Sequence, residues 1–178
     1  MKKYLQQYRP FLLFLASFFG CYILLTIGYQ YFLNSYEEGN VDAITQVVAH
    51  NAEKIISLFV MRVQADSVIH EPFVRMYFQN DYVLRIVEGC NGISVIILFI
   101  SFIVAFSGRL KNTLLFIFGG SLMIYILNVL RIIALIVLLH YYPEHSHILH
   151  GVLFPLIIYG LVIVLWVIWV NKFSKYAK

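Results

Sequence analysis

The chain has 178 residues, of which 61% are hydrophobic and only 12% are charged, and its formal net charge is +4. Soluble domains are close to half apolar and a quarter charged, so this composition excludes an ordinary soluble protein and indicates an integral membrane protein. The basic residues do not gather in a patch of the kind that binds nucleic acid, so we expect no nucleic-acid partner. At this length we expect one membrane domain over residues 1–178, in contact with the lipid bilayer.

Four apolar runs predict about four transmembrane helices, over residues 11–33, 90–107, 113–139 and 148–170. The first run is long enough to cross a hydrocarbon layer of roughly 30 Å and has no small-residue cleavage site. It therefore predicts an uncleaved anchor rather than a signal peptide. The second run is short and is completed only with the residues before it. The pattern as a whole predicts an all-α integral membrane protein.

The charges predict how these four spans are oriented. One group of basic residues lies on the side of both termini: Lys2, Lys3, Arg9, Arg109, Lys111, Lys172, Lys175 and Lys178. The positive-inside rule assigns that side to the cytoplasm. All nine acidic residues lie on the other side, from Glu37 to Glu88 and at Glu144. We therefore predict a multi-pass protein of the cell inner (cytoplasmic) membrane, with both termini in the cytoplasm.

The first two spans are separated by an extracytoplasmic insertion, residues 34–89. Its apolar residues from Ile44 to Phe59 recur at roughly helical spacing, which predicts an amphipathic helix that lies on the membrane. Further along, the β-prone runs 73–78 and 82–87 flank Gln79-Asn80-Asp81. Two such runs around a short turn predict a small β-hairpin whose second strand leads directly to Cys90.

Cys90 stands between Gly89 and Gly92 where the second apolar run begins. A thiol is a stronger nucleophile when its pKa is lowered by a nearby helix N-terminus or cation. The two glycines allow a substrate backbone to approach, Asn91 lies beside the thiol, and backbone N–H groups of the first turn can hold an oxyanion. The alternative is that Cys90 is a small buried residue at a helix cap. The other cysteine, Cys21, lies within the first span, so the two make no disulfide framework.

Arg131 lies inside the third apolar run. Ionisable residues within a membrane segment are costly and are functional by default. The run is longer than the hydrocarbon layer is thick, so Arg131 can lie near the outer boundary, where the alternative is a snorkelling anchor. Asn128, one turn earlier on the same face, can orient the guanidinium or contact the substrate.

Four histidines crowd the loop between the third and fourth spans: His140, His145, His147 and His150. His150 is preferred because it opens the fourth span and precedes Gly151. His147 and His150 are three residues apart and share a helix face, which leaves a metal site open. No second cluster of carboxylates and thiols supports zinc, so no metal and no cofactor is expected. The choice among the four histidines stays open.

The cysteine, the arginine and the preferred histidine lie on separate spans near the outer membrane face. This arrangement predicts a membrane-embedded cysteine peptidase or transpeptidase. Cys90 attacks a peptide carbonyl, His150 transfers a proton to the leaving amine, and Arg131 stabilises the thiolate or the oxyanion.

The motifs that carry this chemistry also resemble those of a known family. Glu88-Gly-Cys-Asn-Gly-Ile93, Asn128-Val-Leu-Arg-Ile132 and His150-Gly151 with Phe154-Pro155 resemble the exosortase/archaeosortase family in order, spacing and membrane placement. The chain looks like a compact form with four spans where many members have about eight. The resemblance implies a bacterial protein-sorting enzyme that cleaves exported proteins carrying a C-terminal motif, a transmembrane helix and a basic tail. It also implies transfer of the product to a surface acceptor.

Two further classes of function are a non-enzymatic role and thiol redox chemistry. A non-enzymatic membrane protein that assists assembly or export remains the alternative. A thiol oxidoreductase is disfavoured because the chain has no Cys-x-x-Cys and no second external cysteine. The substrate motif, the acceptor, the choice between hydrolysis and transfer, and the oligomeric state are left open.

Overall fold

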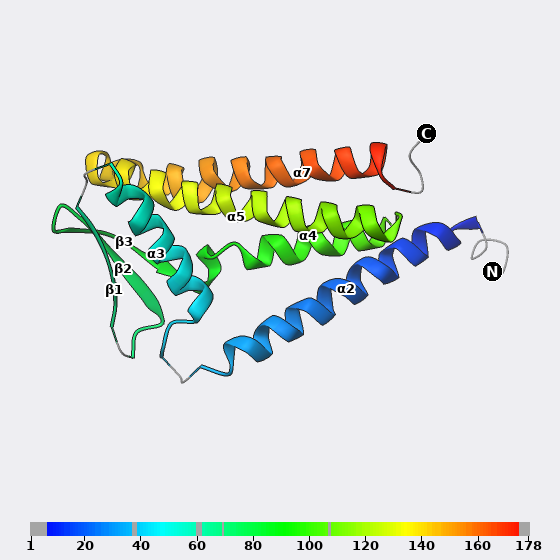
Figure 1. Ribbon diagram of the computed structural model, residues 1–178, viewed down its shortest axis with the longest axis horizontal. Coiled ribbons are helices and arrows are strands. Elements are labelled where there is room, and N and C mark those ends of the chain that lie inside the picture. The colour runs from blue at the N-terminus through cyan, green and yellow to red at the C-terminus, as the bar shows by residue number, and fades with distance from the viewer. Residues whose placement is uncertain (1–6, 37–38, 60–61, 69, 107, 175–178) are drawn as a thin grey trace.

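The computed structural model describes residues 7–36, 39–59, 62–68, 70–106 and 108–174 (Figure 1). A bundle of helices forms most of its length, and a small sheet with one helix forms one end. The bundle consists of α2 (Arg9–Leu33), α4 (Ile93–Ala105), α5 (Leu110–Tyr141) and α7 (Phe154–Lys172). Three short helical turns join α5 to α7: η2 (Pro143–His145), α6 (Ser146–Ile148) and the π-helical η3 (Leu149–Leu153).

Three helical segments of the described chain are long and apolar enough to cross a membrane: Arg9–Leu33, Leu110–Tyr141 and Pro143–Lys172. This confirms a membrane protein built mainly of helices. The predicted second span is represented by α4, whose 13 residues rise only about 20 Å at ~1.5 Å per residue. That length is below the hydrocarbon thickness of roughly 30 Å. Three spans are therefore supported by the described helices, and the fourth stays a prediction.

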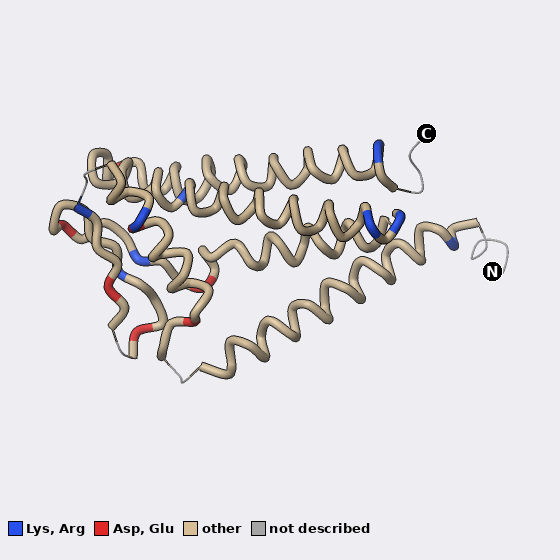
Figure 2. Tube along the Cα trace, viewed as in Figure 1, with Lys and Arg blue, Asp and Glu red and all other residues tan. Residues whose placement is uncertain are grey.

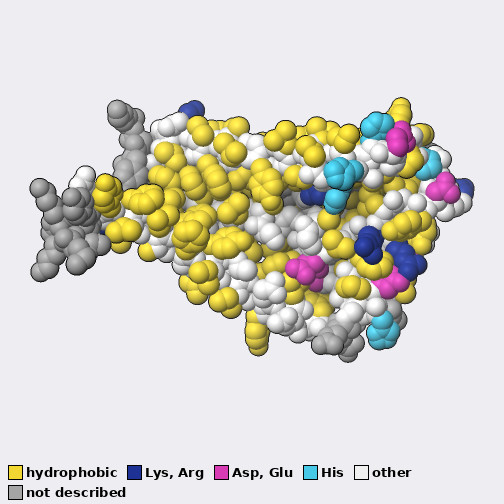
Figure 3. All heavy atoms as spheres, turned by 180° about the vertical axis from the view of Figure 1, so that it is seen from behind, with side chains coloured by type: hydrophobic (Ala, Val, Ile, Leu, Met, Phe, Trp, Pro, Cys, Tyr) yellow, Lys and Arg dark blue, Asp and Glu magenta, His cyan; other side chains and the backbone are white. Residues whose placement is uncertain are grey.

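Charged residues are divided between the two ends of the molecule (Figure 2). All acidic residues of the described chain lie at the end that holds the sheet, whereas Arg9, Arg109, Lys111 and Lys172 lie at the other end. Between the two ends the helix surfaces are apolar, with Leu24, Phe118 and many similar side chains exposed (Figure 3). The topology prediction also used Lys2, Lys3, Glu37, Glu38, Lys175 and Lys178, which lie outside the described residues.

The core of the bundle lies between α4, α5 and α7. Its buried members are Phe99, Ile103, Ile124, Val162, Leu165 and Trp169. The indole N–H of Trp169 donates a hydrogen bond of 3.0 Å to the carbonyl oxygen of Phe106. Helices in lipid pack closely where a small residue lets two backbones approach, and Gly120 has this role on α5, where it contacts the Phe99 ring.

This packing predicts that substitution will destabilise the protein at one of two neighbouring glycines and have little effect at the other. A Cβ added at Gly120 would lie 2.3 Å from a Phe99 ring carbon, whereas one added at Gly119 meets nothing within 4 Å. Gly120→Val is therefore expected to destabilise the protein by about 1–3 kcal/mol through overpacking, which a lower unfolding temperature in detergent would report. Gly119→Val is the matched control, since it carries the same β-branched side chain on the lipid-facing side. Equal unfolding temperatures for the two variants would contradict this packing.

The sheet is antiparallel, with the order β1-β2-β3. Its strands are β1 (Val63–Ser67), β2 (Phe73–Phe78) and β3 (Asp81–Val87). The predicted hairpin is confirmed as β2 and β3, whose turn holds Gln79 and Asn80 with φ of 53° and 75°. The strand β1 was not predicted, and with β2 and β3 it makes the all-α description incomplete.

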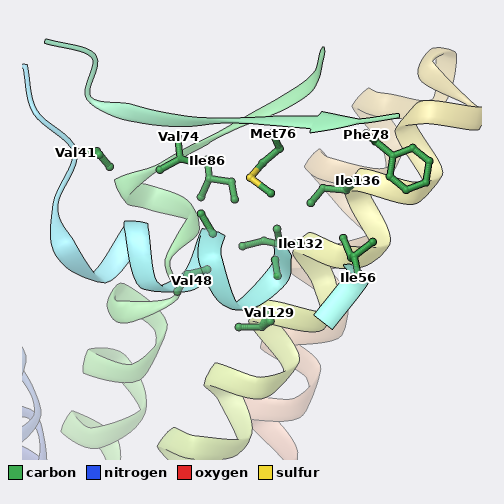
Figure 4. Packing of buried hydrophobic residues seen from close by; sticks show 12 residues of the cluster. Val41, Val48, Ile56, Val74, Met76, Phe78, Ile86, Val129, Ile132 and Ile136 are labelled. Carbon is green, nitrogen blue, oxygen red and sulfur yellow. The ribbon is translucent and has the colours of Figure 1, made fainter. Parts of the chain in front are cut away.

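The predicted amphipathic helix is confirmed as α3 (Ala43–Ser57), which begins with the Asp42 carboxylate accepting a 2.9 Å hydrogen bond from the Thr45 N–H. The placement of this helix on the membrane stays a prediction. Its apolar face is covered by the sheet and by α5, in a cluster that joins Val48 and Ile56 to residues such as Met76 (Figure 4). This helix and the sheet therefore form a small packed layer over the end of α5.

Candidate functional site

A pocket of about 560 Å³ lies where β3, α5 and the short turns before α7 meet. Figure 3 shows the same region from behind, with histidine side chains beside a recessed basic side chain where the apolar surface meets the polar end. The lining residues come from segments far apart in the chain: Leu84, Arg85, Ile86, Val87, Cys90, Arg131, Ile132, Leu135, Leu139, Ser146, His147, His150 and Gly151. The three predicted groups, a thiol, a guanidinium and an imidazole, therefore border one cavity.

Cys90 ends the short 3-10 turn η1 (Glu88–Cys90), which connects β3 to α4. Its thiol is free and half-buried, and its side chain packs against the cluster beneath the sheet. The carbonyl oxygen of Cys90 accepts a hydrogen bond of 2.9 Å from the Asn128 side-chain amide. The strand, the turn and this bond to α5 together hold the thiol at the border of the pocket.

Asn91 and Gly92 have structural roles at the start of α4. The Asn91 side-chain oxygen accepts a 3.0 Å hydrogen bond from the Ile93 N–H, so this amide of the first turn is already satisfied and is not free for an oxyanion. Gly92 has φ of +86°, in the left-handed region that disfavours a Cβ. Neither residue lines the pocket, and Gly89 borders open space rather than packing against a neighbour.

The geometry at Gly92 predicts a second matched pair. A Cβ there would meet the Asn128 side chain at 3.1 Å and would also be strained by the positive φ, whereas one at Gly89 meets nothing within 4 Å. We expect Gly92→Ala to cost about 1–3 kcal/mol of stability, seen as a lower unfolding temperature in detergent. Gly89→Ala should leave that temperature nearly unchanged. If both variants unfold at the same temperature as the wild type, the tight turn after Cys90 does not require glycine at position 92.

Arg131 lies on α5 about 15 Å, at ~1.5 Å per residue, before the helix ends at Tyr141. It shares the pocket with Cys90 and with strand β3, so it lies at the level of the sheet end rather than mid-bundle. Its Nε is buried and has no hydrogen-bond partner among the described residues, and the same holds for the side-chain oxygen of Asn128. Buried unpaired polar atoms of this kind call for an explanation.

The structure separates the four clustered histidines. His147 and His150 line the pocket, whereas His145 lies beside Glu144 at 3.1 Å and the His140 ring packs against Phe78 at 4.8 Å between centroids. His150 sits in η3, the π-helical turn, and such turns often occur at functional sites. It is also close enough to Arg131 for an electrostatic interaction. Within the described residues no three His, Cys, Asp or Glu side chains are grouped so that they could hold a metal ion.

Glu88, two residues before Cys90, adds a titratable group near the site. Desolvation raises the pKa of the Glu88 carboxyl above its ordinary value, and the negative charge of Asp42 raises it further. A raised carboxyl pKa means that folding disfavours the ionised form. The unfavourable contribution therefore grows as the pH rises from the unfolded-state pKa to the folded-state pKa, and it is absent in acid.

A buried network behind Cys90 was not found from the sequence. The Asn91 amide donates hydrogen bonds to the Tyr29 hydroxyl at 2.7 Å and to the Thr45 hydroxyl at 3.2 Å, and the Thr45 hydroxyl donates to Asp42 at 2.6 Å. These contacts link α2 and α3 to the turn that carries the thiol. The one local signal was Asp42, since aspartate commonly begins helices; the pairing with Asn91 is tertiary.

The bundle is apolar and has helices of membrane-spanning length, and Cys90 borders a pocket at its polar end. These features place the chain among membrane proteins with a candidate cysteine site. Within that class, the family model of the transmembrane exosortase (Exosortase_EpsH) matches residues 4–169 of this chain. The chain therefore belongs to the transmembrane exosortase family, as its motifs indicated. Membership in this family supports the assignment of the chain as a membrane transpeptidase of the exosortase kind. No curated protein and no solved structure matches the chain.

Proposed function

We propose that this protein is a membrane-embedded cysteine transpeptidase that cleaves C-terminal sorting signals of exported proteins at the outer membrane–water interface. The observation that carries the proposal is the shared pocket of Cys90, Arg131 and His150. Three groups from three separate segments border one cavity, and each has a defined use in acyl transfer. The proposed chemistry adds residue roles to the family assignment.

The reaction begins with proton transfer from the Cys90 thiol to His150. The thiolate attacks the scissile carbonyl and forms a tetrahedral intermediate. When the intermediate collapses, the C–N bond breaks, the amine leaves with the proton from His150, and the substrate's N-terminal part remains on Cys90 as a thioester. Attack by an amine or hydroxyl of a surface acceptor, or by water, releases the product and restores the thiol.

Arg131 is proposed to stabilise negative charge on the thiolate and then on the oxyanion. Arg131 lines the pocket, and its Nε has no hydrogen-bond partner in the described structure; both observations support this role for the guanidinium. The Asn128 amide is proposed as a positioning group, since it holds the Cys90 carbonyl at 2.9 Å. The unpaired Asn128 oxygen adds an acceptor close by.

The proposed topology places both termini in the cytoplasm and the sheet end outside the inner membrane, because basic residues flank the helices at the opposite end. A single cysteine at Gln64 or at Lys111, in a Cys21→Ala, Cys90→Ser background, tests it. A membrane-impermeant maleimide should label Gln64→Cys in intact spheroplasts and Lys111→Cys only after the membrane is opened. The reverse pattern would invert the topology, and labelling of both in sealed cells would contradict a membrane barrier between them.

The proposed substrates are exported proteins that end in a motif, an apolar helix and a basic tail. A substrate anchored by its own helix meets the site in two dimensions, which raises its effective concentration. The experiment is co-expression of the wild-type protein with such proteins from the same host, with tail loss followed by immunoblot. Processing that requires the protein supports the proposal. Identical processing in a strain lacking it would favour the alternative of a non-enzymatic assembly or export partner.

A further inference from the structure

The strand β3 is both an edge of the sheet and a wall of the pocket. β3 pairs with β2 on one side only, and within the described chain none of its backbone groups is bonded to a backbone partner beyond that strand. Its last four residues, from Leu84 to Val87, line the pocket that Cys90 borders. A row of unpaired N–H and C=O groups therefore runs along the cavity and ends three residues before the thiol.

The two edges of the sheet differ in a way that favours pairing at β3. Proteins protect unused edges by keeping them short and polar. The edge strand β1 has five residues and includes Gln64, Asp66 and Ser67. The edge strand β3 has seven residues; its charged residues are Asp81 at the turn and Arg85, and the other five are apolar or aromatic. The longer and more apolar edge is therefore the one beside the candidate nucleophile.

The cavity beside β3 is also lined by a helix rather than by another strand. Ile132, Leu135 and Leu139 of α5 contribute apolar side chains to its lining. A strand added to β3 lies about 4.8 Å from it, which puts the added strand at the pocket-lining edge of the sheet, beside the α5 residues that line the same cavity. Its alternate side chains would then face the apolar surface of α5.

From these observations we propose that the substrate segment before the scissile bond binds in extended form, as a fourth strand added to the free edge of β3 and parallel to it. This inference rests on the proposed function. Main-chain hydrogen bonds to β3 would supply affinity, and the apolar wall of α5 would select apolar side chains at alternate substrate positions.

The parallel direction follows from how the chain itself passes through the site. From Asp81 the strand runs to Cys90, and the chain then enters α4 and the apolar bundle. The proposed substrate has the same order: an external segment, the scissile bond, and then a helix in the bilayer. With the scissile bond at Cys90 and the substrate helix beside α4, the upstream segment must run in the same direction as β3.

Disulfide mapping tests the added strand. The protein carries Cys21→Ala and Cys90→Ser, with a new cysteine at Arg85 or at Val87. The probe is an exported host protein with an apolar helix and a basic tail whose processing by the wild type requires Cys90, with single cysteines scanned through the residues before its scissile bond. Neighbouring strands bring Cα atoms within disulfide reach. Gln64→Cys on the other edge is the matched control.

We expect crosslinks that are strongest at alternate substrate positions, with the Arg85→Cys partner about two residues N-terminal to the Val87→Cys partner, and loss of crosslinking at Gln64→Cys. The opposite order would overturn the parallel arrangement. Crosslinks without periodicity, or equally strong at Gln64→Cys, would overturn strand addition while Cys90-dependent processing still supports the transpeptidase. If no such host protein is processed in a Cys90-dependent way, the proposed function fails and takes this inference with it.

Discussion

Cys90→Ala is expected to abolish substrate processing while the protein still inserts and folds. Loss of the nucleophile removes the only group at the site that forms the thioester, and in a comparable acyl-transfer enzyme it lowers kcat by a factor on the order of 10⁶. Cys90 is half-buried, and the bond to Asn128 uses its backbone carbonyl, so alanine keeps the turn intact. The measurement is the fraction of tailed substrate converted in co-expressing cells, with membrane yield and unfolding temperature recorded for each variant.

The chain offers its own control for this experiment. Cys21, the other thiol, lies within α2 and outside the pocket. Cys21→Ala should process substrate as the wild type does, and it should remain sensitive to a thiol-alkylating reagent. Processing by a folded Cys90→Ala variant would exclude the proposed mechanism and favour the non-enzymatic alternative.

The second large effect is expected at His150. General acid–base catalysis by a positioned side chain contributes about 10²–10⁴-fold, so His150→Ala should lower the initial rate of processing by a factor in that range. His147→Ala is the matched variant, because both imidazoles line the same pocket and are exposed. His147→Ala should retain most of the activity, since the π-helical turn and the interaction with Arg131 belong to His150.

Three outcomes of this comparison are informative. Loss with His147→Ala and retention with His150→Ala would move the acid–base role to His147. Retention in both would show that neither imidazole transfers the proton. Partial recovery of His150→Ala by added imidazole would support a proton-transfer role over a structural one, because a folding defect does not respond to a small base.

Much of the fold could be predicted because local patterns determined it. The long apolar runs marked the helices α2, α5 and α7, and the β-prone runs around Gln79 and Asn80 marked the hairpin. The strand β1 was missed because its sequence, with Gln64, Asp66 and Ser67, is too polar to signal a strand. It forms because β2 supplies a partner along its whole length.

The start of α4 could not be predicted from the sequence pattern alone. The apolar run suggested a span from residue 90, but α4 begins at Ile93, since Asn91 bonds the Ile93 N–H and Gly92 turns the chain with a positive φ. Likewise, the face of α3 that looked suited to a membrane surface is covered by the sheet. A periodic apolar face indicates that the face is covered, but it does not distinguish a covering of lipid from a covering of protein.

The candidate site was predicted in its parts but not in its surroundings. The residue types and their order suggested Cys90, Arg131 and His150, and the shared pocket adds that their segments meet. The contribution of β3 to the cavity, and the bonds from Asn91 to Tyr29 and Thr45, connect residues tens of positions apart. Such contacts depend on tertiary packing, which no local pattern records.

The most direct test is to identify the covalent intermediate. Wild-type protein would be quenched in acid during processing of a tailed substrate, digested, and analysed by mass spectrometry. The account predicts the substrate's new C-terminus attached through a thioester to the peptide containing Cys90, released by neutral hydroxylamine and absent from Cys90→Ala. Continued processing without this adduct, or an acyl group on any other residue, would contradict it.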